Sequence, residues 1–249
     1  KFGIQVGLDE LFPASYAAAL YISTKYPAIK KAFVIGSQGV MDELAAHGID
    51  SVGGPTPEYS QNFIHTEADF SAVELDKEIG AVVCGWDLGF NFSKLATASL
   101  YLQKGCLFVG TNGDAYDRLS DRNIPGNGCL LKALETSIGK EAEVVGKPSQ
   151  WLIDHLIQSN NLDPKRTIMI GDRLDTDIAF GKKGGTATAL VLTGCTSPSD
   201  LHNQASPVPE EMMPTYVLPS LGSIYSMART ELPPPPPTFL AVDDEAPPG

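Results

Sequence analysis

The segment from Gly171 to Asp177 places three carboxylates directly after the apolar run Thr167 to Ile170. We predict that this run is a buried strand, so that Asp172 emerges at its carboxyl end, where ligands bind in open α/β sheets. Asp175 is positioned to cap the following helix, and Asp177 to lie in its first turn. Two or three acids around one turn can supply the protein ligands of a magnesium ion, which keeps several waters. The alternative for the same pattern is three acids that only cap a helix.

A lysine one βα unit upstream favours the chemical interpretation. Lys147 follows the short apolar run Val144-Val145 and precedes Pro148. If the two runs are adjacent strands of a parallel sheet, the Lys147 ammonium lies beside Asp172. There it can neutralise a phosphate and the charge that develops during phosphoryl transfer. A lone lysine before proline is usually a solvated turn residue. The phosphate-binding interpretation therefore depends on Lys147 lying next to Asp172.

The strands and helices that position these residues are indicated by short apolar runs that alternate with helical segments. This alternation is typical of βα units with a mostly parallel sheet, so we predict the α/β class. Gly48, Gly105 and Gly139 mark helix ends, and Ser149 can cap the helix that follows it. We expect strands at residues 32–35, 81–84, 107–109, 144–145, 167–170, 187–192 and 216–218, and helices at 15–25, 37–47, 92–103, 128–138, 150–156 and after Ser220.

Composition excludes several other classes. A net charge of -12 without a basic stripe argues against a nucleic-acid partner. No apolar stretch approaches the roughly 18 residues of a spanning helix, and no signal-peptide pattern opens the chain, so we expect no membrane partner and a cytoplasmic location. The four cysteines form no CxxC pair and are expected to be reduced thiols. The four histidines have no metal-ligand spacing to one another.

Two segments resemble motifs of the haloacid dehalogenase (HAD) phosphatases. VVGKPS (Val144 to Ser149) and MIGDRLDTDI (Met169 to Ile178) resemble the third and fourth motifs of that superfamily. Four further segments resemble the subfamily that contains phosphoglycolate, 4-nitrophenyl and pyridoxal phosphatases. They are FPASYAAALYI (12–22), VVCGWDLGFNFSKL (82–95), GTNGD (110–114) and PGNG (125–128). The resemblance covers about residues 5 to 227 in the order of the family.

The resemblance implies a Rossmann-like core with an inserted α/β cap domain of the C2 type. Residues 1–27 would be a remnant of the N-terminal core half, 28–134 the cap and 135–230 the C-terminal core half. Composition alone predicts that residues 231–249, with five consecutive prolines, form a tail that is disordered or polyproline II. In such enzymes an aspartate attacks phosphorus and water hydrolyses the resulting aspartyl-phosphate. By resemblance, Lys147 is catalytic and holds the phosphate, Asp172 ligates Mg²⁺, Asp177 supports the metal, and Asp175 is a weaker candidate.

By resemblance, residues 111–119 form the specificity region for a small phosphorylated metabolite. Tyr116, Asp117 and Arg118 would face the substrate, and Asn112 also belongs to this substrate-binding set, although it and Asp114 fit structural roles as well. Pyridoxal-type relatives have a histidine near the position of Asp117, and its absence favours 2-phosphoglycolate. The alternative is that these are solvated turn positions. Relatives of this type form dimers through the cap, so a homodimer is a further expectation.

The departure from the family concerns the nucleophile. The 249 residues contain no Asp-x-Asp-Gly, and Asp87, which follows a strand, has no second acid two residues later. We therefore expect a truncated chain whose remaining core strands have exposed edges. The alternatives are an inactive fragment or a non-catalytic binding protein. A receiver-like switch would use similar acids, but the roughly hundred-residue insert before Lys147 disfavours it.

Overall fold

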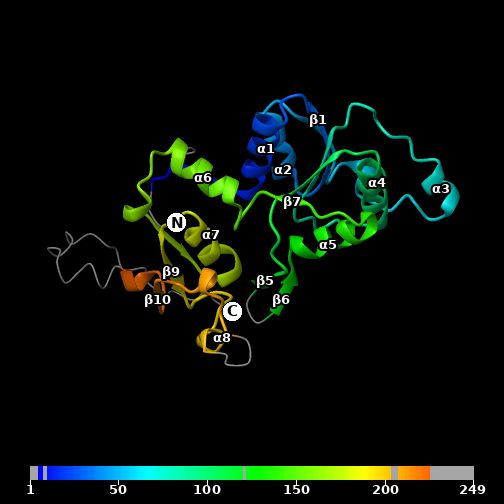
Figure 1. Cartoon of the computed structure of the whole chain (residues 1–249). Helices are drawn as coiled ribbons and strands as arrows, with labels where there is room; N and C mark the ends of the chain where they lie inside the picture. The colour runs from blue at the N-terminus through cyan, green and yellow to red at the C-terminus, as the bar shows by residue number, and fades with distance from the viewer. Residues whose placement is uncertain (1–4, 8–9, 120–121, 203–206, 225–249) are drawn as a thin grey trace, which may run out of the picture.

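The computed structural model describes residues 5–7, 10–119, 122–202 and 207–224. The predicted tail, residues 231–249, lies outside the described residues. Figure 1 shows two units side by side, one built on a five-stranded sheet and one on a three-stranded sheet, with a small hairpin between them. No helix within the described residues is long and apolar enough to cross a membrane.

The larger unit has a parallel sheet with the strand order β2-β1-β3-β4-β7. Its strands are β1 (Lys31–Ile35), β2 (Asp50–Gly53), β3 (Ala81–Cys84), β4 (Leu107–Gly110) and β7 (Glu143–Val144), and its helices are α1 (Ala14–Lys25), α2 (Gln38–Ala46), α3 (Glu67–Ser71), α4 (Phe92–Gln103) and α5 (Asn127–Ile138), with a 3-10 turn, η2 (Pro57–Tyr59). The α/β class with a mostly parallel sheet is therefore confirmed.

Apolar layers cover both faces of this sheet. Val34 and Val83 lie in a buried cluster with residues of α1 and α2. Phe33 and Val82 lie in a second buried cluster, with residues of α4 and α5. Successive residues of a strand point to opposite faces, so two apolar faces require uninterrupted apolar strands. This requirement explains the runs AFVI and AVVC in the sequence.

Local signals set the helix ends. The side chain of Asn91 accepts a hydrogen bond from the Lys94 N–H at the start of α4. Gly139, with φ of 67°, ends α5 in the left-handed conformation that glycine adopts without strain. Ser149 caps the next helix, α6 (Gln150–Ser159), by accepting from Leu152 N–H. The predicted helices at these places are confirmed.

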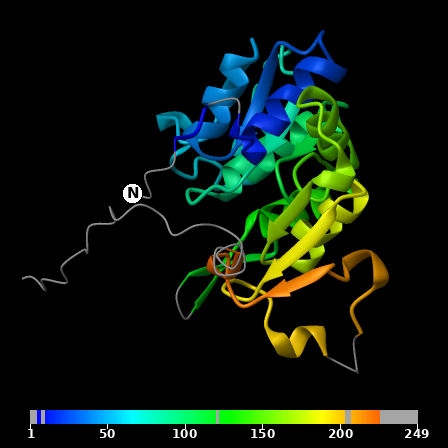
Figure 2. The same cartoon turned by 90° about the vertical axis from the view of Figure 1, so that its left-hand side faces the viewer.

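The smaller unit has a parallel sheet with the order β10-β9-β8. Figure 2 shows the three strands side by side. The described elements of this unit are β8 (Ile168–Gly171), β9 (Ala187–Val191), β10 (Tyr216–Leu218), α6, η3 (Pro164–Arg166), η4 (Leu174–Ile178), α7 (Ala179–Lys183), α8 (Pro198–Leu201) and η5 (Glu210–Met212).

Two strand predictions are wrong. The strand before Asp172 is not buried: β8 lies at the edge of its sheet, its other residues are half-buried, and Ile168 is 44% exposed. An apolar sequence secures burial only where a neighbour covers it, and β8 pairs only with β9 among the described strands. The strand before Lys147 is not next to β8 either, because β7 pairs with β4 in the other sheet. The predicted exposed edge is thus present.

The predicted domain boundaries stay a prediction. The described strands nevertheless place residues 143–144, which we assigned to the C-terminal core half, in the sheet of residues 28–134. Helix α1, which we assigned to the N-terminal core half, packs in the same apolar cluster as β1 and β3. That cluster also contains Leu152 and Ile153 of α6 and Phe180 of α7, so one apolar layer joins the two units.

Candidate active site

Asp172 lies directly after β8, and its carboxylate is enclosed by the loop that follows β9. Its Oδ2 accepts a hydrogen bond of 2.8 Å from the backbone N–H of Cys195, and its carbonyl accepts one from Thr196 N–H. A Cβ at Gly194 would lie 2.0 Å from Asp172 Oδ2. Glycine at 194 is therefore what allows this loop to approach the carboxylate.

The Asp177 carboxylate is the centre of the polar contacts. Its Oδ2 accepts from the backbone N–H groups of Asp172 and Arg173, at 3.1 and 3.2 Å. Its Oδ1 accepts from the Lys147 ammonium at 2.6 Å. A Cβ at Gly171 would lie 2.2 Å from Asp177 Cγ, so the strand end also needs glycine. Asp177 is thus only 4% exposed, yet both of its oxygens have partners.

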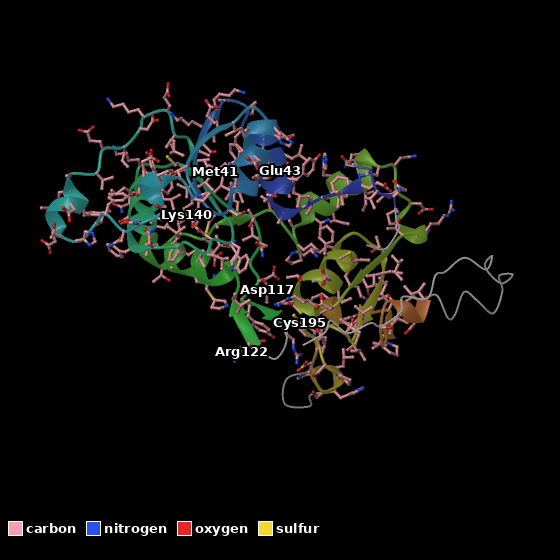
Figure 3. All side chains as sticks on the ribbon, turned by 180° about the vertical axis from the view of Figure 1, so that it is seen from behind. Met41, Glu43, Asp117, Arg122, Lys140 and Cys195 are labelled. Atoms are coloured by element: carbon pink, nitrogen blue, oxygen red, sulfur yellow. The ribbon has the colours of Figure 1, made fainter. Side chains whose placement is uncertain are left out.

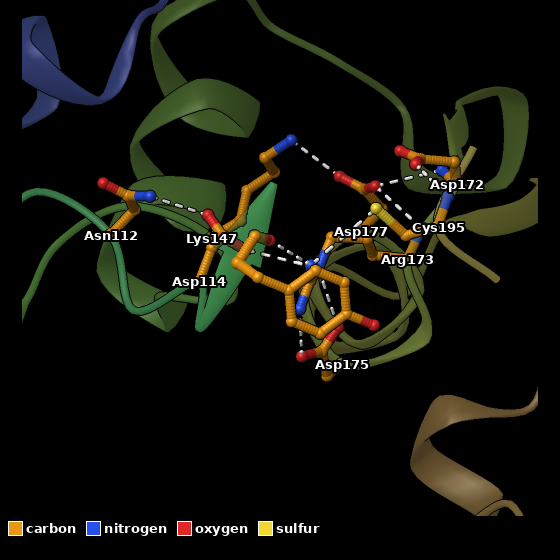
Figure 4. Close-up of polar contacts among 9 residues, drawn as sticks. Asn112, Asp114, Lys147, Asp172, Arg173, Asp175, Asp177 and Cys195 are labelled. Carbon is orange, nitrogen blue, oxygen red and sulfur yellow. Dashed lines mark hydrogen bonds and ion pairs between the residues drawn. The ribbon is translucent and has the colours of Figure 1, made fainter. Parts of the chain in front are cut away.

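Lys147 reaches this carboxylate from the other sheet. Val145 N–H donates to Gly110 O, and a Cβ at Gly146 would lie 2.1 Å from Thr111 O, so the loop of Lys147 runs against the end of β4. The Lys147 side chain is 47% exposed, so part of the ammonium faces solvent. Figure 4 shows Lys147 extending toward Asp177. The predicted convergence of Lys147 with the acids is present, although two sheets produce it instead of adjacent strands.

The turn after Asp172 differs from the predicted helix cap. Residues Leu174–Ile178 form one turn of π-helix whose N-cap position is Arg173, and no side chain caps it. Asp175 lies inside this turn, where both of its oxygens accept from the Arg173 guanidinium, at 3.1 and 2.8 Å. Since Asp175 points to a cation of its own loop, it is not placed as a helix cap.

The specificity region forms a hairpin, which we did not predict. Its strands β5 (Tyr116–Leu119) and β6 (Arg122–Pro125) pair antiparallel. Asp117 and Arg118 line an open pocket of about 620 Å³ together with Asp172 and residues 192–195. Figure 3 labels Asp117 of the hairpin and Cys195 of the smaller unit near each other, and both line this pocket. The hairpin therefore brings two of the predicted substrate residues to the predicted metal ligand.

Asn112 and Tyr116 have other surroundings. The Asn112 side chain accepts from Thr111 Oγ1 at 2.8 Å and donates to Asp114 Oδ2 at 2.7 Å, so it is engaged within its own loop. Tyr116 lies against Arg173, and the two residues line a different hollow from the one that contains Asp172. The structure thus separates the predicted substrate residues into two groups.

Two residues of this site were missed at the sequence level. Arg173 contacts both the acidic turn and the hairpin, and Cys195 holds Asp172 through its backbone. The position of Arg173 between Asp172 and Asp175 could have indicated that it pairs with an acid of this turn. Burial and the neighbouring Asp172 carboxylate raise the pKa of the Cys195 thiol.

Comparison with known proteins identifies the family. A family of HAD-hydrolase-like proteins matches residues 144–224, the segment that carries Lys147 and the acidic turn. Phosphoglycolate phosphatase 2 from Arabidopsis thaliana is 42% identical over 204 residues, which are 80% of this chain and 67% of that protein. The chain belongs to the HAD phosphatases.

Two solved HAD phosphatases resemble the whole structure. The p-nitrophenyl phosphatase from Archaeoglobus fulgidus matches with a TM-score of 0.71 at 29% identity. The match covers 91% of this chain and 77% of that protein's chain. The glycerol phosphate phosphatase from Mycobacterium tuberculosis in complex with magnesium matches with a TM-score of 0.70 at 25% identity. This match covers 89% of this chain and 60% of that protein's chain. The chain spans 56% of the length of the chloroplastic phosphoglycolate phosphatase 1A from Arabidopsis thaliana, which is 41% identical.

Proposed function

We propose that this protein acts as a magnesium-dependent phosphomonoesterase on small phosphorylated metabolites, with 2-phosphoglycolate as its preferred substrate. The observation that carries the proposal is the contact of the Lys147 ammonium with the Asp177 carboxylate, 2.6 Å apart, beside the backbone of Asp172. A cation close to hard oxygen donors is what phosphoryl transfer requires, and Asp172 also lines an open pocket.

The residues at the end of β8 fit a magnesium ion that keeps most of its waters. Asp172 uses Oδ2 to accept from Cys195 N–H, and its carboxylate lines the pocket. The described residues contain no group of three or more acids, histidines or cysteines that could hold a metal ion by themselves. Magnesium commonly binds through one or two carboxylates together with waters and substrate phosphate, so this small donor set is compatible with it. Bound there, it would supply positive charge at the transferring phosphoryl group.

The residues of the chain have separate tasks in this proposal. Asp172 ligates the metal. Asp177, whose oxygens are both engaged, orients Lys147 and the backbone of the acidic turn instead of binding the metal directly. Lys147 holds the phosphate, because its half-exposed ammonium can donate to a phosphate oxygen while it keeps its contact with Asp177.

The substrate preference is inferred from the pocket. Arg118 and Asp117 line it together with Asp172, and an arginine there can bind a carboxylate of the leaving group in a bidentate manner. 2-Phosphoglycolate carries such a carboxylate, whereas glycerol phosphate and 4-nitrophenyl phosphate do not. The similarity to a plant phosphoglycolate phosphatase supports the same choice.

An aspartate nucleophile is required to form the aspartyl-phosphate intermediate, and the 249 residues contain no Asp-x-Asp-Gly. The assay is therefore run on this chain and on a version extended upstream by a strand that ends in Asp-x-Asp-Gly. Phosphate release is measured with 2-phosphoglycolate, glycerol 3-phosphate, pyridoxal phosphate and 4-nitrophenyl phosphate, with and without Mg²⁺.

We expect the extended protein to hydrolyse 2-phosphoglycolate with the highest kcat/KM and to need Mg²⁺. Asp172→Asn should abolish turnover, and Lys147→Ala should lower kcat by about 10²- to 10³-fold. Asp154→Asn, an exposed change on α6, is the control. Unchanged turnover in Asp172→Asn would remove Asp172 from the metal site. Ligand binding without turnover in the extended protein would favour the non-catalytic alternative.

Two further expectations remain proposals. We infer a cytoplasmic location from the composition and a homodimer through the cap from the resemblance. Sedimentation equilibrium of the extended protein tests the second: a mass of one chain at micromolar concentration would reject it.

A further inference from the structure

Arg173 connects the acidic turn to the hairpin that lines the pocket. Within its own loop the guanidinium binds Asp175 through two parallel hydrogen bonds, Nε to Oδ1 at 3.1 Å and Nη2 to Oδ2 at 2.8 Å. The Arg173 side chain is 12% exposed. Such a bidentate contact fixes the plane of the guanidinium as well as its position, which a lysine cannot do.

The remaining contacts of Arg173 cross to the other unit. Nη1 donates to the backbone carbonyl of Tyr116, the first residue of β5, at 3.0 Å. The guanidinium carbon lies 5.3 Å from the centroid of the Tyr116 ring, within the range of a cation–π contact. Figure 4 shows Arg173 between Asp175 on one side and Asp114 on the other.

Asp114 gives Arg173 a second acidic partner. Its Oδ1 lies 3.4 Å from Arg173 Nε and is buried without a hydrogen bond in the described part of the chain. Its Oδ2 accepts from Asn112. An anionic oxygen buried in this way is costly unless a charge compensates it, and Arg173 supplies that charge. The loop before the hairpin is therefore tied to the acidic turn as well.

The hairpin depends on such contacts for its position. A two-stranded hairpin is marginally stable by itself in water. On the opposite strand, Trp86 Nε1 donates at 2.9 Å to the carbonyl of Pro125, the residue that pairs with Tyr116, which ties β6 to its own unit. The contacts of Arg173 tie β5 to the unit that carries Asp172. Asp117 and Arg118 follow Tyr116 directly, so their distance from Asp172 depends on this second set of contacts.

We propose that Arg173 is a positioning residue for substrate recognition, which fixes the β5–β6 hairpin against the acidic turn so that Asp117 and Arg118 face the site of Asp172. The kinetic part of the proposal rests on the proposed function, whereas the structural part does not.

Hydrogen exchange of the whole chain tests the structural part without any activity. In Arg173→Ala the amides of residues 116–119 and 122–124 should exchange about tenfold faster or more than in the wild type, since hydrogen bonds to a charged group are lost. Arg173→Lys should show an intermediate acceleration because it keeps the charge without the planar fork. Arg166→Ala removes an exposed arginine of η3 and should leave the hairpin unchanged. Unchanged hairpin exchange in Arg173→Ala would overturn the proposal.

The amides of β3 serve as an internal reference for global unfolding. If Arg173→Ala also accelerates exchange at residues 81–84, Arg173→Lys decides. Faster hairpin exchange in Arg173→Lys, with β3 unchanged, supports the positioning role. An unchanged hairpin in Arg173→Lys overturns it.

Kinetics of the extended protein test the consequence for recognition. Arg173→Lys should raise KM for 2-phosphoglycolate about tenfold while kcat changes less, because Lys147 and Asp172 stay in place. A role in overall stability alone would lower the active fraction and leave KM unchanged, which would refute the positioning role. If the wild type releases no phosphate from any substrate, the proposed function fails, and hydrogen exchange still decides the role of Arg173.

Discussion

The carboxylate of Asp177 is engaged on both oxygens without any ligand. Lys147 contacts one oxygen, and two backbone N–H groups contact the other. A group in this situation acts on a metal through its neighbours. It holds the backbone N–H of Asp172 and keeps the ammonium of Lys147 at the acidic turn. This geometry supports our proposal that Asp177 is an orienting group, whereas its position in the sequence equally allowed a direct ligand.

Asp177→Asn should therefore lower Mg²⁺ affinity by about 10- to 100-fold, the usual effect of removing an orienting partner of a metal site. The amide side chain can still accept from the backbone, but it no longer carries the charge that attracts Lys147. Isothermal calorimetry with Mg²⁺ on the extended protein measures the change. Asp154→Asn, an exposed change on α6, is the control and should leave the affinity nearly unchanged. Equal affinities of Asp177→Asn and wild type would contradict the orienting role.

The thiol of Cys195 should react slowly at neutral pH. Burial raises its pKa, and Asp172 raises it further, so less thiolate is present at a given pH than in an ordinary cysteine. Alkylation by iodoacetamide, followed by mass spectrometry without Mg²⁺, should be slower for Cys195 at neutral pH than for a small free thiol, and its rate should still rise with pH where that of the free thiol has levelled off. Asp172→Asn removes the nearby charge and should speed the reaction. A rate at pH 7 equal to that of a small free thiol would show that the pKa is not raised.

At the scale of the elements, the loop between β7 and α6 depends on contact with the end of β4. A Cβ at Gly146 would lie 2.1 Å from the carbonyl oxygen of Thr111, and this neighbour is backbone that cannot rotate away. Gly146→Ala should therefore displace the Lys147 loop and destabilise the protein by about 1–3 kcal/mol. Urea unfolding followed by circular dichroism measures the loss.

Gly39→Ala is the matched control. Gly39 lies near the start of α2, and the nearest atom to a Cβ there is Ser37 Oγ at 3.8 Å. Alanine should stabilise this helix by up to about 1 kcal/mol, since glycine has more backbone entropy to lose. Opposite signs for the two changes are expected. A Gly146→Ala protein as stable as the wild type would show that the loop can be moved at little cost.

The sequence alone was sufficient to predict features that depend on neighbouring residues in the chain, such as helix ends. The helix at 92–103 was predicted with the bounds of α4, with Gly105 marking its end, and the structure adds the Asn91 cap at its start. The sequence was insufficient where the partner of an element matters. The burial of β8 depends on which strands flank it, and the sheet of β7 depends on β4, more than 30 residues earlier in the chain.

The same reasoning applies to the site. The sequence predicted that Lys147 converges with Asp172 and Asp177, and the structure brings the three together; their chemical roles stay a prediction. The sequence missed Arg173, since the contact with the Tyr116 carbonyl joins residues that are 57 positions apart. It also missed the hairpin, whose strands of four residues each carry too short a pattern to indicate extended structure.

At the scale of the whole molecule, the two units differ in how well their sheets are covered. All four residues of β3 are buried, whereas β8 is exposed or half-buried and two of the three residues of β10 are exposed. Native-state hydrogen exchange should therefore show the longest protection for the amides of β1 and β3 and much shorter protection for β8 and β10. Amides of β8 that exchange as slowly as those of β3 in this chain would contradict this order.

The apolar layer around α1 belongs to both units, since it contains Ala18 of α1, Val83 of β3, and Leu152 and Phe180 of the smaller unit. If the larger unit were expressed alone, the apolar residues of α1 that pack in this layer would be exposed to water. Polar replacements on the α1 face that meets α6 would then be needed to keep the isolated unit from self-associating.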